Sequence, residues 1–143
     1  SCTRKTMTFK ELEHTADVRM KITASTLPEL FAESGFALAE TLYGTYSRDT
    51  AQCSFQIAAE GKDAEETIVN FLSELLFLTE TEYLVPTSFS LTAESLAVFG
   101  TVGGVVFDKT KHAGGIGVKG ISYSGISYTR RDADYELIII FDI

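Results

Sequence analysis

The C-terminal stretch 135–143 constrains the fold most. It reads Tyr-Glu-Leu-Ile-Ile-Ile-Phe-Asp-Ile, so apolar and β-branched side chains follow one another with almost no alternation. A strand with one face in water alternates apolar and polar residues, whereas a strand covered on both faces is apolar throughout. We therefore predict that this stretch forms a strand in the middle of a sheet.

Two strand–helix units are predicted earlier in the chain. Apolar and polar residues alternate over 18–22, as in a half-buried strand, and helical spacing follows over 26–44, with Thr26 placed to cap the helix. The pattern then recurs, because 53–59 alternates again and Asp63 precedes a second apolar run with helical spacing. This recurrence suggests an internal duplication.

From Pro86 onward the sequence predicts mainly strands, interrupted by glycines. The expected strands cover 89–93, 96–107 and one or two segments within 118–128. Two helices and several antiparallel strands make an α+β domain, which we expect to be two-layered, with both main helices packed on a mostly antiparallel sheet. Residues 1–143 are interpreted as one domain, of which 1–7 are expected to be disordered or a remnant of cloning.

The charge balance disfavours two classes of partner. The chain has 12 Lys and Arg against 20 Asp and Glu, a formal charge of −8. Phosphate backbones and anionic membranes both attract basic surfaces, so neither a general nucleic-acid binder nor a membrane-surface protein is expected. No apolar run is long enough to span a bilayer and no signal sequence is evident, so we expect a cytoplasmic protein.

Common catalytic motifs are missing from the sequence. It contains no Gly-rich nucleotide loop, no nucleophile elbow and no His-Glu-x-x-His zinc motif. The two cysteines, Cys2 and Cys53, form neither a disulfide framework nor a four-thiolate zinc site. The two histidines, His14 and His112, exclude a histidine-rich metal site. His112 lies in a glycine-rich loop and is expected to be exposed.

One constellation of oxygen ligands remains. Asp17 stands at the entrance of the 18–22 strand, and Asp142 is the penultimate residue, next to the α-carboxylate of Ile143. If the terminal strand pairs with the 18–22 strand, these three carboxylates converge and repel one another unless a cation lies between them. Oxygen ligands suit calcium, magnesium or manganese. The alternative from pattern alone is that Asp17 caps a turn and Asp142 is solvated.

The stretch Glu11-Leu-Glu-His-Thr-Ala-Asp-Val18 is similar to the signature of the archease family. The Thr-Leu-Pro-Glu-Leu-Phe helix, the Phe-Leu-Ser-Glu-Leu-Leu-Phe helix, the Val118-Lys119 element and the Phe-Asp-Ile ending extend the resemblance from about Phe9 to Ile143. The His-Thr-Ala-Asp element and the Asp-Ile ending are its specific parts.

The resemblance implies a function and a site. Archeases are small acidic partners of the GTP-dependent RNA ligase of tRNA splicing; they promote guanylylation of the ligase and its repeated turnover, and are not known for a reaction of their own. By match, the family's metal site falls on Asp17, Asp142 and Ile143, with calcium the expected cation. The family's functional lysine corresponds to Lys119, and we expect His14 to orient the loop before Asp17.

The residues around Lys119 depart from the family pattern. Gly117 replaces an acidic residue, Gly120 replaces alanine and Ser122 replaces threonine, while Thr101 replaces a common glutamate in a middle strand. Lys119 therefore has two interpretations, a contact to phosphate or carboxylate and an ordinary surface lysine. Two other functions stay open: a metal-dependent hydrolase that uses Asp17 and Asp142, and a binding module stabilised by calcium.

Overall fold

The computed structural model describes residues 17–143. The expectations for residues 1–7 and for His14 lie outside this described part. In chain order, the helices and strands are β2 (Asp17–Ala24), α1 (Leu27–Tyr43), β3 (Cys53–Glu60), α2 (Ala64–Thr81), β4 (Leu84–Ala93), β5 (Ala97–Val106), β6 (Gly120–Ile121), β7 (Ser127–Arg131) and β8 (Asp134–Asp142). Neither helix in this part of the chain is long and apolar enough to cross a membrane.

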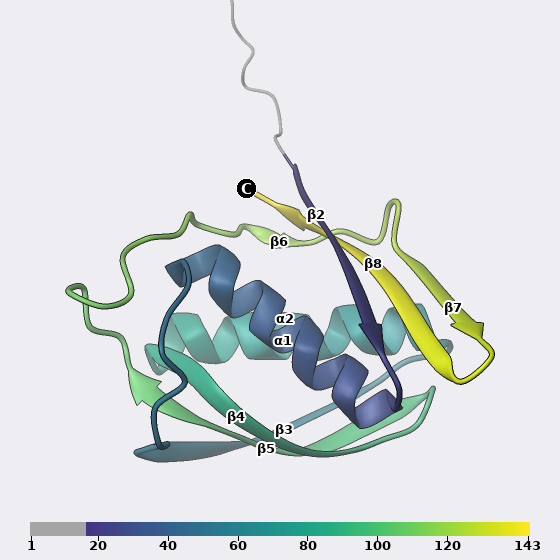
Figure 1. Ribbon diagram of the computed structural model, residues 1–143, viewed down its shortest axis with the longest axis horizontal. Helices are drawn as coiled ribbons and strands as arrows, with labels where there is room; N and C mark the ends of the chain where they lie inside the picture. The colour runs from purple at the N-terminus through teal and green to yellow at the C-terminus, as the bar shows by residue number, and fades with distance from the viewer. Residues whose placement is uncertain (1–16) are drawn as a thin grey trace, which may run out of the picture.

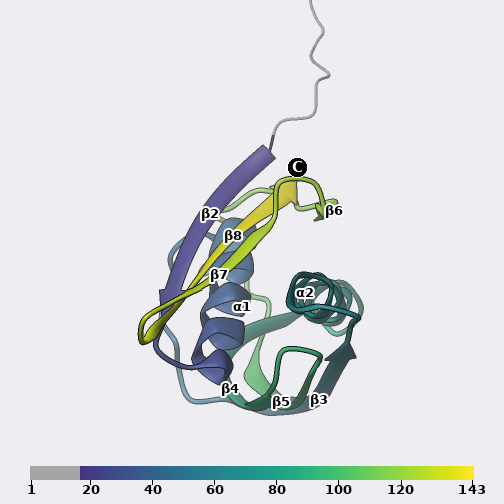
Figure 2. The ribbon, with the colours of Figure 1, turned by 90° about the vertical axis from the view of Figure 1, so that its right-hand side faces the viewer.

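The strands form two antiparallel sheets. β8 lies between β2 and β7, with the short β6 beside its end, and β5 lies between β3 and β4. Both helices lie in the angle between the sheets (Figures 1 and 2), and each contacts strands of both. The predicted α+β fold, with two helices packed on antiparallel strands, is confirmed.

The strands are divided between two sheets, where the sequence suggested one, because the buried residues of each helix are too widely spread to be covered from one side. In α1 they include Leu30, Phe31, Phe36 and Leu38. The two strand–helix units are both present, with β2 and β3 at the edges of different sheets. An internal duplication stays a prediction.

The helix starts follow the sequence signals. The N–H of Glu29 donates to Thr26 Oγ1 at 3.2 Å, and the N–H of Glu66 donates to Asp63 Oδ1 at 2.8 Å. α1 ends at Gly44, whose φ of 77° suits glycine. Local sequence therefore determines where both helices begin.

The central position predicted for the terminal strand is confirmed. β8 pairs with β2 over the whole of β2 and with β7 on its other side. Leu137, Ile139 and Phe141 are completely buried, and the intervening Ile138 and Ile140 are half-buried on the opposite face. The core also contains Phe31 and Phe71, one from each helix, in an edge-to-face contact with ring centroids 5.2 Å apart.

Two strand boundaries differ from the sequence-based expectation. β4 begins at Leu84 and so includes Pro86, where the register of its pairing with β5 shifts. β4 is an edge strand, and an edge is where a strand tolerates proline. Within 118–128 the structure has only the two-residue β6 and the first residues of β7.

Candidate functional site

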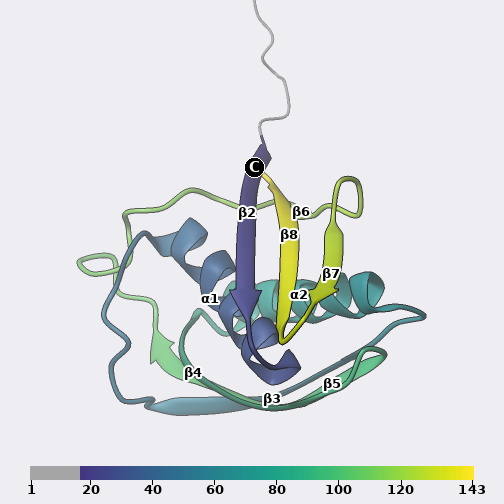
Figure 3. The ribbon, with the colours of Figure 1, turned by 45° about the vertical axis from the view of Figure 1, so that its right-hand side comes forward.

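The candidate site lies at the rim of the first sheet, where β2 begins and β8 ends (Figure 3). Asp17 and Asp142 are directly opposite one another in the antiparallel register. Their neighbours Val18 and Phe141 pack into the core, so alternation places both aspartate side chains on the outer face. Directly opposite residues have Cβ atoms about 4.5–5.5 Å apart, close enough for two carboxylates to share a cation.

A third segment reaches the same rim from the other side of β8. Gly120 in β6 pairs with Asp142, and the N–H of Lys119 donates to the carbonyl oxygen of Asp142 at 2.7 Å. The side chain of Ile143 packs against the core, which holds the end of the chain next to Asp142. The structure therefore brings together four of the five predicted site residues; the fifth, His14, lies outside residues 17–143.

The donor set fits a hard divalent cation only if backbone or terminal oxygens contribute. Among the described residues, no group of three or more His, Cys, Asp and Glu side chains is arranged to hold a metal. Asp17 and Asp142 supply two carboxylates, and Ile143, the third ligand expected from the sequence, follows Asp142 directly. A cation here would need further oxygen ligands from Ile143, water or backbone carbonyls to complete its shell.

The expectation that His112 is exposed was wrong. Its side chain is buried, with only 4% exposed, between the rings of Tyr43, Tyr46 and Phe107. The glycine-rich sequence around it gave no sign of this, because its aromatic neighbours come from the end of α1 and the end of β5. Burial raises the pKa of the Tyr43 and Tyr46 hydroxyls above the ordinary tyrosine value.

The glycines before Lys119 fit against the C-terminal end of α1. The N–H of Gly114 donates to the carbonyl of Tyr43 at 3.1 Å, and the N–H of Ile116 donates to the carbonyl of Thr41 at 2.8 Å. A Cβ on Gly115 would lie 2.3 Å from the carbonyl carbon of Leu42, so only glycine allows this close approach. The sequence showed a turn here, but not its role in satisfying the last carbonyls of the helix.

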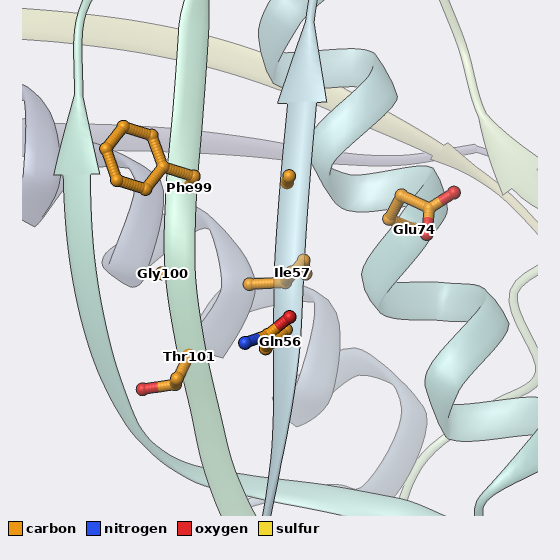
Figure 4. Close-up of a pocket in the computed structure, with 7 residues that line it drawn as sticks. Gln56, Ile57, Glu74, Phe99, Gly100 and Thr101 are labelled. Carbon is orange, nitrogen blue, oxygen red and sulfur yellow. The ribbon is translucent and has the colours of Figure 1, made fainter.

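A separate shallow hollow of about 480 Å³ lies on the second sheet, across β3 and β5 (Figure 4). Its polar side chains include Gln56, Thr101 and Glu74. It includes none of the site residues predicted from the sequence. A single carboxylate among uncharged groups indicates no particular reaction, and we assign this hollow no chemistry.

The family resemblance is confirmed by comparison with known proteins. A family model described as the Archease protein family (MTH1598/TM1083) matches residues 9–143. The chain belongs to the archease family.

Two curated relatives illustrate this. The chain is 34% identical to a protein named archease-like from Drosophila melanogaster, over 96% of this chain and 91% of the relative. It is 30% identical to a protein named archease from Pyrococcus furiosus, over 85% of this chain and 88% of the relative. Membership of the family therefore rests on the whole chain and not on one motif.

Solved archease-like structures share the fold. The crystal structure of an archease, described as a possible chaperone, from Thermotoga maritima has a TM-score of 0.67 at 18% identity, covering 95% of this chain and 98% of that one. The solution structure of a Methanobacterium thermoautotrophicum protein has a TM-score of 0.70 at 21% identity, covering 90% of this chain and 94% of that one. At these identities the likeness supports the architecture alone.

Proposed function

We propose that this protein activates the GTP-dependent RNA ligase of tRNA splicing by promoting its guanylylation, without catalysing a reaction of its own. Membership of the archease family supports the proposal. The single observation that carries it is the rim of the first sheet, where Asp17 and Asp142 face each other beside Lys119. These are the positions that the archease resemblance assigns to function.

The distribution of charge suits a partner with a basic cleft. Neither helix contains a lysine or an arginine, while α1 carries Glu29, Glu33 and Glu40, and α2 carries four glutamates. With a net charge of −8, such a protein is attracted over long range to a cationic surface, as the active site of an RNA- and GTP-binding enzyme is expected to be.

In this proposal Asp17, Asp142 and the carboxylate of Ile143 hold a divalent cation, with calcium the first candidate and magnesium or manganese the alternatives. When bound, such a cation neutralises the charge of phosphate oxygens and polarises them. Lys119 adds a positive charge at the same rim. Its backbone bond to Asp142 fixes where the lysine side chain starts, and the residue is exposed, so its ammonium group can contact a phosphate of the partner.

The deciding experiment measures guanylylation of the ligase with and without this protein. We expect the unmodified protein to accelerate it, and Asp17→Asn and Asp142→Asn each to lose at least about tenfold of that stimulation. Asp134→Asn is the matched control, because Asp134 is an exposed aspartate at the opposite end of β8. Lack of stimulation by the unmodified protein rejects the proposed function. Full stimulation by both site variants leaves the function standing but rejects the site.

A second measurement tests the cation directly. Calorimetric titration with calcium, magnesium and manganese is expected to show weaker binding in Asp17→Asn and in a version extended by two residues beyond Ile143, but not in Asp134→Asn. Unchanged affinity in the extended version removes the terminal carboxylate from the ligand set. Hydrolysis of phosphoesters by the protein alone would instead support a metal-dependent hydrolase.

A further inference from the structure

His112 makes a specific polar contact inside its aromatic surroundings. Its Nδ1 accepts a hydrogen bond from the backbone N–H of Asp108 at 3.0 Å, and its own backbone N–H donates to the carbonyl of Asp108 at 2.8 Å. The two residues are thus linked twice, once through the backbone and once through the imidazole. A buried imidazole that accepts at Nδ1 must carry its single proton on Nε2.

The turn closed by Asp108 and His112 belongs to the segment 107–119, which joins the second sheet to the candidate site. The segment is attached at intervals: Phe107 to the carbonyl of Tyr83 at 2.8 Å, Ile116 to the end of α1, and Lys119 to Asp142. The two hydrogen bonds between Asp108 and His112 close a turn within the segment, and the imidazole joins this turn to the end of α1 through its contacts with the rings of Tyr43 and Tyr46. The imidazole is therefore placed to control the path of the chain toward Lys119.

We propose that His112 is a positioning residue whose neutral imidazole, through Nδ1, holds the segment 107–119 in the path that places Lys119 beside Asp142. The contribution of the ring is specific: it is an acceptor as well as a space-filling group. The inference about position stands on the structure alone, and only its consequence for ligase stimulation rests on the proposed function.

Protonation opposes this arrangement. A second proton on the imidazole turns Nδ1 into a donor, which then faces the N–H of Asp108, so the hydrogen bond is lost.

Two substitutions separate the role of Nδ1 as a hydrogen-bond acceptor from the role of the ring in filling space. His112→Asn keeps a side-chain oxygen near the position of Nδ1 but removes most of the ring, and it does not titrate. His112→Phe keeps an aromatic ring among Tyr43, Tyr46 and Phe107 but has no acceptor. A role that is only structural packing predicts that phenylalanine is tolerated better than asparagine, whereas our proposal predicts the reverse.

Amide hydrogen exchange measured by NMR on the full chain is the test, with the N–H groups of Ile116 and Lys119 as reporters and that of Ile139 in the core of β8 as reference. In His112→Phe we expect both reporters to exchange at least about tenfold faster relative to Ile139. In His112→Asn we expect them to stay within about threefold of the unmodified protein. The proposal is overturned if the reporters are as protected in His112→Phe as in the unmodified protein. It is also overturned if they lose more protection in His112→Asn than in His112→Phe.

The ligase assay is kept separate from these measurements. If the exchange results follow the proposal, His112→Phe is expected to reduce the stimulation of guanylylation and His112→Asn to retain most of it. Equal stimulation by both variants despite different exchange would reject the link to function and leave the structural role. No stimulation by the unmodified protein would reject the proposed function and leave the exchange result untouched.

Discussion

The two sheets pack against the same two helices but differ in what they show to solvent. The outer face of the β2–β8–β7 sheet carries charged side chains beside the half-buried Ile138 and Ile140. The charged residues are Asp17, Arg19, Lys21, Glu136 and Asp142, along two adjacent strands. The outer face of the β3–β5–β4 sheet, apart from Glu60 at the end of β3, presents the uncharged side chains of Ser54, Gln56, Ala58, Phe99 and Thr101.

Their backbones differ as well. β5 carries Gly100, Gly103 and Gly104, where the neighbouring strands leave no room for a Cβ, whereas β8 is built from large apolar residues. We interpret the β3–β5–β4 sheet as a tightly fitted support, the support sheet, and the β2–β8–β7 sheet as the one that carries the candidate site at its rim. Four predictions test this division, in order of decreasing expected effect.

The largest effect is expected in the support sheet. A Cβ on Gly100 would lie 2.0 Å from the carbonyl oxygen of Ser90, at a φ of 155° that disfavours other residues. Gly100→Ala should therefore lower the free energy of unfolding by roughly 3–5 kcal/mol, measured by urea denaturation. Thr101→Ala, on the exposed face, is the control and should change it by less than about 0.5 kcal/mol. If the folded Gly100→Ala protein also lost divalent-cation binding, the two sheets would not be independent.

The second prediction compares two glycines on the approach to the candidate site. Gly115→Ala should cost about 1–3 kcal/mol in unfolding free energy, because its Cβ would overlap the backbone of Leu42. Gly120→Ala should instead stabilise the protein by about 0.4–1 kcal/mol, because no atom of residues 17–143, apart from Gly120 itself and its chain neighbours, lies within 4 Å of its Cβ position. Equal effects of the two substitutions would contradict the close fit of the segment against α1.

The third prediction concerns Tyr46, which ties the end of α1 to the support sheet by donating to the carbonyl of Pro86. Tyr46→Phe should cost about 1 kcal/mol at neutral pH. Because burial raises the pKa of Tyr46, the folded protein holds the phenolic proton more tightly than the unfolded chain. The stability gained in this way is complete below about pH 10, the pKa of an unfolded tyrosine, and is lost as the pH rises toward the folded value.

Urea unfolding at about pH 8 and pH 10.5 measures this. The unmodified protein should lose stability over the interval, and Tyr46→Phe should lose less. Tyr123→Phe, at an exposed tyrosine, serves as the control and should behave like the unmodified protein. An equal alkaline loss in Tyr46→Phe would show that its hydroxyl is not the group responsible.

The smallest effect is expected on the charged face. Lys21 Nζ lies 3.3 Å from a carboxylate oxygen of Glu136, which also forms an ion pair with Arg131 at 3.8 Å, and the Lys21 side chain is 65% exposed. Lys21→Ala should cost only about 0.2–1 kcal/mol and less at high salt. A cost above about 2 kcal/mol that salt does not change would show that this face contributes to the core and is not simply solvated.

Local sequence predicted the elements that depend on neighbouring residues. Thr26, Asp63 and Gly44 mark helix ends through hydrogen bonds that span only a few residues, so their positions could be inferred directly. The central place of residues 135–143 was also predictable, because a strand apolar on both faces must be covered on both. The convergence of Asp17 and Asp142 needed one assumption, that their strands pair, and the register shows that pairing.

His112 and the division into two sheets could not be predicted in this way. The burial of His112 depends on Phe107, five residues before it, and on Tyr43 and Tyr46, which are more than 60 residues away and reach it only when the end of α1 packs beside the end of β5. The identity of each strand's partner likewise depends on how the two helices are covered, and alternation within a strand carries no information on that choice.

The sequence by itself determined the family, the helix ends, the acidic surface and the strand that must be central. These follow from residue type and short-range spacing, which act before the chain is compact. Only the tertiary structure decided that Lys119 lies against Asp142, that a histidine in a glycine-rich loop is buried, and that the outer face of one sheet carries most of the charged strand residues. Such features depend on contacts between distant segments, and those contacts are set by the packing of the whole domain.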